Sequence, residues 1–272
     1  MNKRLLVASD LSRNAQFAGK WAARHAASAG HSLVLYHAVT VEGTGHPSFE
    51  VRREAIVKEL EDAAWTKVRA CAAALQAAAP GVDILCDVEV RDDRVDAILG
   101  ATRRLDAAAI VVGSRGENPL SRAVLGSVAT GVLARANCPV VVVPKHARYH
   151  GLEQVVLASD LTDLARDLDE LDRFVGEARP ALRILHLRRA DEPAPTHDAL
   201  TVAAECGWPH ATFTASAGDD YAEMIDEVVA DVSADLVAMT VQEHGTLYRL
   251  FHRDLVHAVA FEGLVPVLGL RG

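Results

Sequence analysis

The residues with the clearest chemical potential lie between positions 112 and 127, which read VGSRGENPLSRAVLGS. Three glycines and a serine follow the spacing G-x2-G-x9-G-S: Gly113, Gly116, Gly126 and Ser127. Glycine permits positive φ and lets backbone N–H groups approach an anion without a Cβ in the way. A helical pattern follows at 128–136, and a helix start adds unpaired N–H donors and the positive end of a dipole. The segment predicts an anion-binding loop.

Side chains around this loop suit a phosphate ligand, but they do not prove that the loop binds one. Arg115 and Arg122 offer positive charge, and Ser127 is placed to cap the helix or to donate its hydroxyl to a phosphate oxygen. No GxxxxGK[ST] is present, which excludes a P-loop NTPase. Glycines before a helix are also common turn punctuation, so the loop alone leaves an anion site and a plain turn both open.

The elements that would position this loop alternate between strands and helices. We expect strands at 4–9, 32–39, 82–90, 108–112 and 140–143, and helices at 13–29, 48–79, 92–104 and 128–136. Alternating strands and helices predict crossover units and a parallel sheet with both faces covered.

The chain also repeats itself in one order. LLVASDLS at 5–12 recurs as VVLASDLT at 155–162, and NCPVVVVP at 137–144 resembles LVPVLGL at 264–270. Matching segments of the two copies are 150 residues apart at the start of the repeat and about 127 apart at its end. The second copy has therefore lost a segment, which we place near the Pro-rich stretch 190–197. A repeat this long predicts two copies of one domain. We expect domains at 1–144 and 154–272, joined by a polar linker at 145–153.

The glycine spacing, the strand ending in Val-Gly and NCPVVVVP together resemble the ATP-binding class of universal stress proteins. VASDLS resembles the first strand and acidic residue of that family. The resemblance covers the first half, and the second half is similar in outline. It implies an α/β chain of two tandem flavodoxin-like (Rossmann-like) domains, each a five-stranded parallel sheet of order 3-2-1-4-5 flanked by helices.

The same resemblance implies ATP at the switch point between strands one and four, where open α/β sheets bind ligands. Ala8, Ser9 and Asp10 would approach adenine and ribose, and Ala38, just after strand two, would meet adenine through its backbone. The phosphates would be lined by Gly113, Arg115, Gly116, Gly126, Ser127 and Val128. A divalent ion, Mg or Mn, would bridge phosphate oxygens, although the sequence shows no ligand set for it. For Asp10, helix capping without a ligand is the alternative.

The second half departs from the glycine pattern. Its three glycine positions are occupied by Met239 or Thr240, by Gln242 or Glu243, and by His252 or Arg253, depending on one gap. Such side chains would fill an anion site, so we expect one ATP site per chain, in the first half. His244, His252 and His257 fit no zinc signature and are expected to be exposed or packed, with a metal or anion site as the alternative. His146 and His150 in the linker are expected to be solvated.

The fifth strands, at 139–144 and 265–270, would be apolar edge strands, which invite pairing. In the family, strand five pairs across a dimer. We therefore expect the two copies here to pair within one chain as a pseudo-dimer, while self-association of whole chains stays open.

Composition excludes several partner classes. The net charge of −9 without a basic stripe argues against nucleic acids and anionic membranes. No signal peptide or membrane-length apolar run is apparent, and Cys71, Cys86, Cys138 and Cys206 form no CxxC pair. Four dispersed thiols suit a reducing compartment, so we expect a cytoplasmic protein.

No arrangement of residues indicates fast catalysis, so we assign no catalytic residues. The favoured interpretation is a stress-response regulator in which ATP occupancy acts as a switch. The alternatives are a slow ATP hydrolase of the adenine nucleotide α-hydrolase-like fold, and a scaffold or binder of a non-nucleotide ligand. Enzymes of that fold carry an SGGxDS-like loop after strand one, and ASDLSR lacks its glycines.

Overall fold

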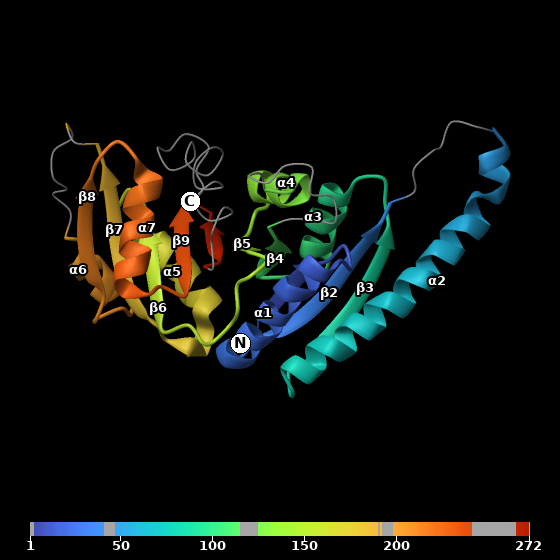
Figure 1. Cartoon of the computed structure of the whole chain (residues 1–272), viewed down its shortest axis with the longest axis horizontal. Coiled ribbons are helices and arrows are strands. Elements are labelled where there is room, and N and C mark those ends of the chain that lie inside the picture. The colour runs from blue at the N-terminus through green and yellow to red at the C-terminus, as the bar shows by residue number, and fades with distance from the viewer. Residues whose placement is uncertain are drawn as a thin grey trace.

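The structure is a computed structural model that describes residues 3–40, 47–114, 125–189, 191, 198–240 and 265–271, without the side chains of 47–53. Its strands form one sheet in the order β3-β2-β1-β4-β5-β10-β9-β6-β7-β8 (Figure 1). The elements of the first half are β1 (Arg4–Ala8), α1 (Arg13–Ala29), β2 (Ser32–Val39), α2 (Pro47–Ala78), β3 (Ile84–Val90), α3 (Arg94–Arg104), β4 (Ala109–Gly113), α4 (Ser127–Arg135) and β5 (Val140–Val143). Those of the second half are β6 (Gln154–Ala158), α5 (Leu164–Val175), the 3₁₀-helix η1 (Gly176–Ala178), β7 (Ala181–Arg188), α6 (Ala199–Glu205), β8 (Thr212–Ala217), α7 (Tyr221–Val232), β9 (Leu236–Thr240) and β10 (Val267–Leu270).

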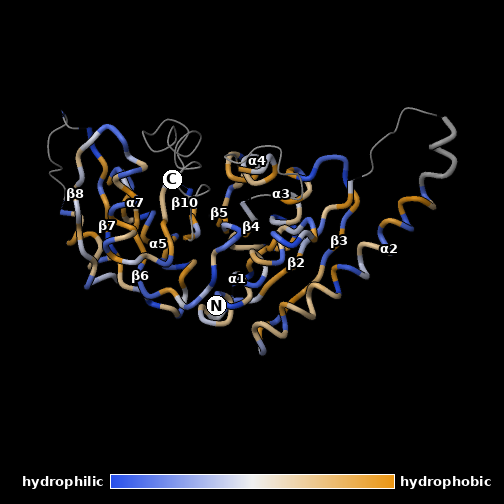
Figure 2. Tube along the Cα trace, viewed as in Figure 1, coloured by the Kyte–Doolittle hydropathy of each residue, from blue (hydrophilic) through white to orange (hydrophobic). Residues whose placement is uncertain are grey.

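Within each half all neighbouring strands are parallel and follow the predicted order 3-2-1-4-5. Helices cover both faces of the sheet. Buried residues of α1, α2, α5 and α6 form one core cluster, and those of α3, α4 and α7 form the other. Figure 2 shows apolar residues along the strands and, alternating with polar ones, along α2. The continuous apolar strands of the sequence are therefore explained by burial on two faces.

Helix α1 shows how local sequence sets an element. The Ser12 side chain accepts a hydrogen bond from the Ala15 N–H at the first turn, and Gly30 ends the helix at φ 70° with its N–H bonded to the Ala26 carbonyl. These are the usual side-chain cap and left-handed glycine end of a helix. The predicted bounds 13–29 are confirmed.

The loss of a segment in the second copy is visible as a shortened helix. Helix α2 has 32 residues, whereas α6, between the corresponding strands, has 7. This difference accounts for the falling offset between the repeats. In the described part of the chain, no helix combines the length and apolar character needed to cross a bilayer.

The two halves meet through their fifth strands. β5 and β10 pair antiparallel, with Val142 opposite Val267 and Val140 opposite Gly269. The predicted pairing within one chain is therefore observed. Each strand covers the hydrogen-bonding edge of the other, so neither is left as an open apolar edge.

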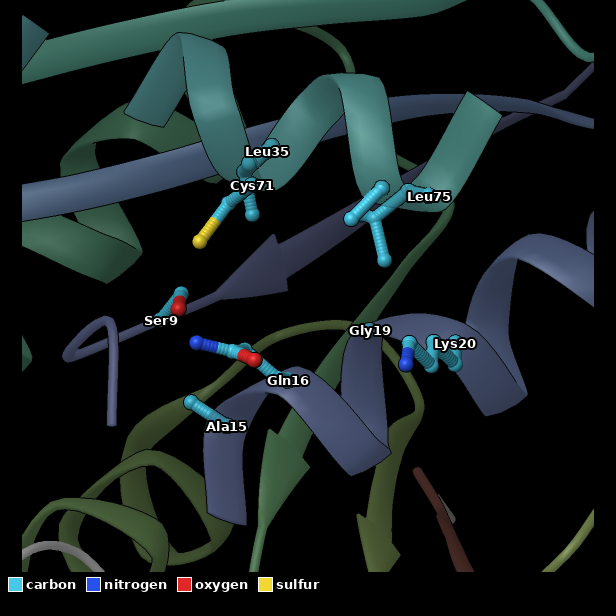
Figure 3. A pocket seen from close by; sticks show the side chains of 9 residues that line it. Ser9, Ala15, Gln16, Gly19, Lys20, Leu35, Cys71 and Leu75 are labelled. Carbon is cyan, nitrogen blue, oxygen red and sulfur yellow. The ribbon is translucent and has the colours of Figure 1, made fainter. Parts of the chain in front are cut away.

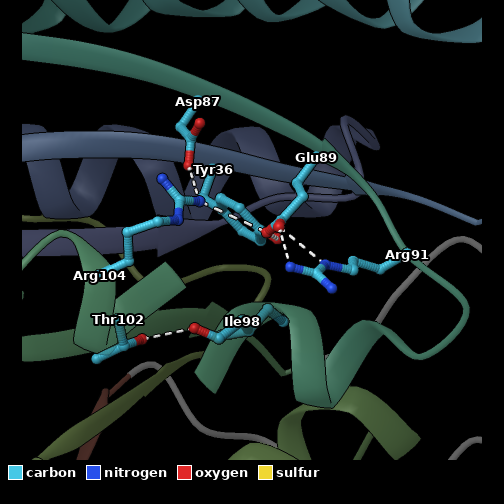
Figure 4. A network of polar contacts seen from close by, with 7 residues as sticks. All are labelled: Tyr36, Asp87, Glu89, Arg91, Ile98, Thr102 and Arg104. Atoms are coloured by element: carbon cyan, nitrogen blue, oxygen red, sulfur yellow. Dashed lines mark hydrogen bonds and ion pairs between the residues drawn. The ribbon is translucent and has the colours of Figure 1, made fainter. Parts of the chain in front are cut away.

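A polar network closes the outer end of the first half (Figure 4). The hydroxyl of the fully buried Tyr36 donates to Glu89 at 3.0 Å, and Arg104 from α3 reaches Asp87 at 2.7 Å. Arg91 also pairs with Glu89. Burial raises the pKa of Tyr36 above its usual range, so its hydroxyl stays a donor. The network satisfies polar groups on the edge strand β3.

The segment 145–153 joins β5 to β6 as predicted, but it is partly buried although its sequence is polar. Ala147, Tyr149 and Leu152 are buried, while His146 and His150 are exposed as expected. The Tyr149 ring meets Trp21 edge to face at 5.5 Å, and its hydroxyl is hydrogen-bonded to Ser28. Apolar contacts with α1 hold this segment, because its few apolar residues all face inward.

Two histidines from the first half bind the end of α5 in the second. The His25 ring stacks on Phe174 at 4.4 Å, and both His25 and His31 donate from Nε2 to the Phe174 carbonyl, at 3.1 and 2.9 Å. Gly176 allows this approach: it has φ 54°, and a Cβ there would lie 2.3 Å from the Ala29 carbonyl oxygen. Burial lowers the pKa of His31 and brings that of His25 to about 3.

This histidine site predicts acid sensitivity. Because the folded-state pKa of His25 is depressed, the unfolded chain binds a proton below about pH 6.5 that the folded chain refuses until about pH 3. We expect His25 to cost about 2 kcal/mol of unfolding free energy between pH 8 and pH 5. His25→Phe keeps the stacking and should remove that part of the slope in denaturant titrations. An unchanged slope would contradict the assignment; His146→Phe, at an exposed histidine, is the matched control.

Candidate functional site

The turn after β1 is held in one conformation by its own side chains. The Ser9 N–H donates to the Tyr36 carbonyl at 2.9 Å, which extends the β1–β2 ladder, and the Ser9 hydroxyl accepts from the Leu11 N–H at 3.0 Å. Asp10 Oδ1 accepts from the Ser12 N–H at 3.0 Å, and Leu11 has φ 63°. A non-glycine residue at positive φ is uncommon and persists here because these bonds hold it.

Asp10 therefore has a structural role at the start of α1. The alternative that Asp10 caps the helix is wrong, because the cap is Ser12, and Asp10 accepts a hydrogen bond from the N–H of that cap residue. Asp10 is nevertheless exposed, and its Oδ2 has no hydrogen-bond partner among the described residues. The carboxylate can take part in the turn and still accept a hydrogen bond from a ligand.

His37 is a contributor that the sequence analysis did not name as a site residue. Its Nδ1 donates to the Ser9 carbonyl at 2.7 Å, and burial lowers its pKa, which favours the neutral ring. His186 makes the corresponding bond to the Ser159 carbonyl at 3.2 Å. The sequence does carry a signal for this contact, because a histidine occurs near the end of the second strand in both repeats.

The end of β4 lies beside the turn. β1 pairs with β4 so that Ala8 lies opposite Val112, and Gly113 is the next residue. The Gly126 N–H donates to the Ser114 carbonyl at 3.0 Å, which fixes the start of α4 next to the end of β4. Arg115, Gly116 and Arg122 lie outside the described residues.

Helix α4 begins without a side-chain cap. Its N-cap residue is Gly126, at φ −60° and ψ 146°, whereas Ser12, Asp93, Asp198 and Asp220 cap their helices with side chains. The N–H groups of the first turn of a helix have no acceptor within it, and the dipole is positive there. The start of α4 can therefore bind an anion through its backbone.

Two expectations about this loop need correction. Neither Gly113 nor Gly126 has a positive φ, so what glycine contributes there is the absent side chain and not an unusual backbone. Ser127 is the first helical residue and exposed, and it does not cap the turn, because Gly126 occupies the capping position. Val128, the next residue, is half-buried.

The described candidates share one edge of the sheet. Ala8, Ser9 and Asp10 end β1, while Gly113 ends β4 and leads to α4. Ala38 was expected just after the second strand, but it lies within β2, one residue before its end and opposite Glu89 of β3. It sits at the same carboxyl edge because β2 is the other neighbour of β1.

A small hollow of about 10 Å³, partly open to solvent, lies behind Ser9 between α1 and α2 (Figure 3). Gln16 and Lys20 bring polar groups to it, and Cys71 and Leu75 bring apolar ones. Burial raises the pKa of the Cys71 thiol. The hollow is on the face covered by α1 and α2, whereas α4 packs on the opposite face, so the hollow is distinct from the anion-binding helix start.

The second half repeats the turn almost bond for bond. The Ser159 hydroxyl accepts from the Leu161 N–H at 3.1 Å, Asp160 Oδ1 accepts from the Thr162 N–H at 2.9 Å, and Leu161 has φ 67°. β6 pairs with β9 so that Ala158 lies opposite Met239. Met239 thus corresponds to Val112, and Thr240 occupies the position of Gly113.

Side chains fill the edge of the sheet at that position. The Thr240 hydroxyl donates to Asp167 Oδ2 at 2.6 Å, and the Ser159 hydroxyl donates to the same oxygen at 3.1 Å. Asp167 is 2% exposed, and burial raises its pKa to about 6. The other positions discussed for the second half lie outside the described residues: Gln242, Glu243, His244, His252, Arg253 and His257.

Comparison with known proteins finds relatives of the first half and solved structures with the fold of the whole chain. Residues 1–144 match the universal stress protein family. A universal stress protein of Thermus aquaticus is 37% identical over 145 residues, which are 53% of this chain and 99% of that protein. The crystal structure of a universal stress protein from Archaeoglobus fulgidus superposes with a TM-score of 0.75 at 18% identity, covering 98% of each chain. A putative universal stress protein from Pseudomonas aeruginosa has a TM-score of 0.58 at 16% identity, covering 99% of this chain and 93% of its own.

Asp167 gives a prediction opposite in sign to that for His25. Its folded-state pKa is raised to about 6, so the folded chain keeps a proton that the unfolded chain releases near pH 4, and stability is lost as pH rises through 6. Asp167→Asn should be more stable than the wild type at pH 8, by on the order of 1–3 kcal/mol, and equal to it near pH 4. Chemical unfolding at both pH values tests this. Asp169→Asn, at an exposed position of α5, should show no such crossover. An Asp167→Asn protein with wild-type stability at pH 8 would refute the prediction.

Proposed function

Because the chain belongs to the universal stress protein family, we propose that it is a cytoplasmic regulatory protein whose first half binds ATP. The ligand lies at the carboxyl ends of β1 and β4, and its occupancy acts as a switch. The domain of residues 1–144 holds the nucleotide, and the domain of residues 154–272 is a degenerate copy that does not.

The observation that carries this proposal is the start of α4. A helix that begins at a bare glycine beside the end of a parallel strand offers free N–H groups and a positive dipole end to phosphate oxygens. The backbone of Ser127 and Val128 belongs to that first turn. Gly113 leaves room beside it, and we assign Arg115 and Gly116 of the same sequence motif to the phosphates.

The other side of the proposed site suits a nucleoside. The turn at Ser9 and Asp10 is rigid before any ligand arrives, so ordering it costs little on binding. The exposed Asp10 carboxylate accepts from a ribose hydroxyl, and Ala8 and the backbone of Ala38 line the adenine. In this proposal, the turn after β1 binds the nucleoside and the start of α4 binds the phosphates of the same nucleotide.

A divalent ion, Mg or Mn, would accompany the triphosphate. The described residues contain no group of three or more ligands suited to a metal. Such an ion would therefore be held mainly by phosphate oxygens and water, as Mg²⁺ often is beside nucleotides. The chain's own residues would act by positioning the phosphates.

The second half argues for a single site. Thr240 occupies the position equivalent to Gly113, and its hydroxyl is bonded to Asp167 of α5, so phosphate would meet side chains and a buried carboxylate instead of open backbone. The proposal assigns no catalytic residues, and ATP serves as an effector.

Gly126→Asp tests the site directly. The carboxylate would cap α4 and so preserve or raise its stability, but it would repel phosphate from the same N–H groups. We expect ATP affinity, measured by titration calorimetry of the full chain, to fall at least about 100-fold, while the melting temperature without ATP does not fall.

Two controls sharpen this test. Gly100→Ala, on α3 where a Cβ meets open space, should bind ATP as the wild type does. Asp160→Asn, at the second-half turn, should also leave ATP affinity unchanged. Wild-type protein that releases no adenine nucleotide on denaturation and shows no heat of ATP binding would refute the proposed function.

A further inference from the structure

Arg271, at the end of β10, contacts both halves of the molecule. Its Nη2 donates to the Leu133 carbonyl of α4, and its backbone N–H donates to Glu170 Oε2 of α5 at 2.7 Å. One contact thus reaches a helix of the first half, and the other reaches a helix of the second.

The Leu133 carbonyl lies in the last turn of α4, where carbonyl groups lack partners within the helix. The Ala136 N–H donates to the Val132 carbonyl, and the Arg271 guanidinium donates to the Leu133 carbonyl. A cation is favourable at the negative end of a helix dipole. Arg271 therefore holds the carboxyl end of the helix whose amino end is the anion-binding start at Gly126.

Glu170 connects this contact to the interior of the second half. Burial raises the pKa of Glu170, while its bond to the Arg271 N–H and the nearby charges of Arg166, Arg173 and Arg271 act in the opposite direction. Glu170 is three residues from Asp167 on α5, and Asp167 joins Ser159 to Thr240. Arg271 thus contacts the helix, α5, that also carries Asp167, the residue bonded to the strand ends of the second half.

The first half has no residue equivalent to Arg271 that could make the reciprocal contact to the second half. The repeats align Pro139 with Pro266, so the first-half counterpart of Arg271 is Pro144. Proline has no N–H and no side-chain donor, and it cannot make the reciprocal contact. The second half therefore supports a helix of the first half, without an equivalent contact from Pro144.

We propose that Arg271 is a positioning residue that couples the phosphate end of the first-half site to the second half. This inference rests on the proposed function. Phosphate at the start of α4 and the guanidinium at its end act on the same nine-residue helix, so fixing either end favours the other. By linkage, nucleotide binding stabilises the Arg271 and Glu170 contacts to the same extent that those contacts favour the nucleotide.

Calorimetry with Mg-ATP on the full chain gives the first test. Arg271→Gln should weaken ATP binding roughly fivefold or more, and Arg271→Lys, which keeps the cation, should weaken it less. Arg183→Gln is the matched control, because it removes the same charge from β7, three strands away from β10 in the sheet. It should bind as the wild type does.

Hydrogen exchange gives a second readout that a purely structural role would not change. In the wild type, Mg-ATP should slow exchange at 267–271 and in α5 as well as around α4, and in Arg271→Gln the slowing should be confined to the first half. If the wild type binds ATP but protection never reaches the second half, or if Arg271→Gln binds with wild-type affinity, the coupling is refuted. If the wild type binds no ATP, the proposed function itself fails. Should Arg271→Gln not fold, the wild-type exchange pattern and Arg271→Lys decide the question.

Discussion

Antiparallel pairing between β5 and β10 is the constraint on which the rest of the molecule depends. The pairing is short, with three residue pairs, and it joins two parallel sheets into one. Such a short ladder has to be reinforced, and the reinforcement comes from side chains on either side of it. His25 and His31 hold the end of α5 through the Phe174 carbonyl, and Arg271 holds α4.

The duplicated turn separates structure from ligand chemistry. Ser9 and Asp10 form the same hydrogen bonds as Ser159 and Asp160, although only the first turn faces a glycine at the neighbouring strand end. The turn is therefore kept by its own bonds and does not need a nucleotide to form. What distinguishes the two copies is the residue after the fourth strand, and Thr240 with Asp167 replaces the open backbone at Gly113.

Much of the fold was predictable from sequence because its signals are local. The Ser12 cap and Gly30 delimit α1, and uninterrupted apolar strands with helices between them indicate a parallel sheet. The strand order within each half came from a family resemblance, and the structure confirms it. The burial of part of the linker could not be predicted, because Tyr149 packs on Trp21, which lies 128 residues away, within a stretch of polar composition.

The candidate site was predictable in part for the same reason. Asp10 and Gly113 end adjacent strands and could be placed by topology. Gly126 has a negative φ and occupies the capping position in place of Ser127, and a glycine followed by a serine does not indicate in sequence which of the two begins the helix. The bond of His37 to Ser9 spans 28 residues, and the recurrence of a histidine in both repeats is its one signal in the sequence. The bonds of Asp167 to Thr240 and of Arg271 to Leu133 span 73 and 138 residues, and no local pattern indicates them.

Joining the two fifth strands in one polypeptide changes what this assembly can do over time. Because the two halves are covalently linked, each has a high effective concentration for the other. Dilution therefore does not separate them, and exchange with a half of a related chain is disfavoured. A homodimer must carry every substitution twice, on both sides of its axis. In this chain, a substitution such as threonine for glycine alters only one of the two halves. The two halves can therefore diverge, and under the proposed function one binds the ligand while the other is free to contact partners.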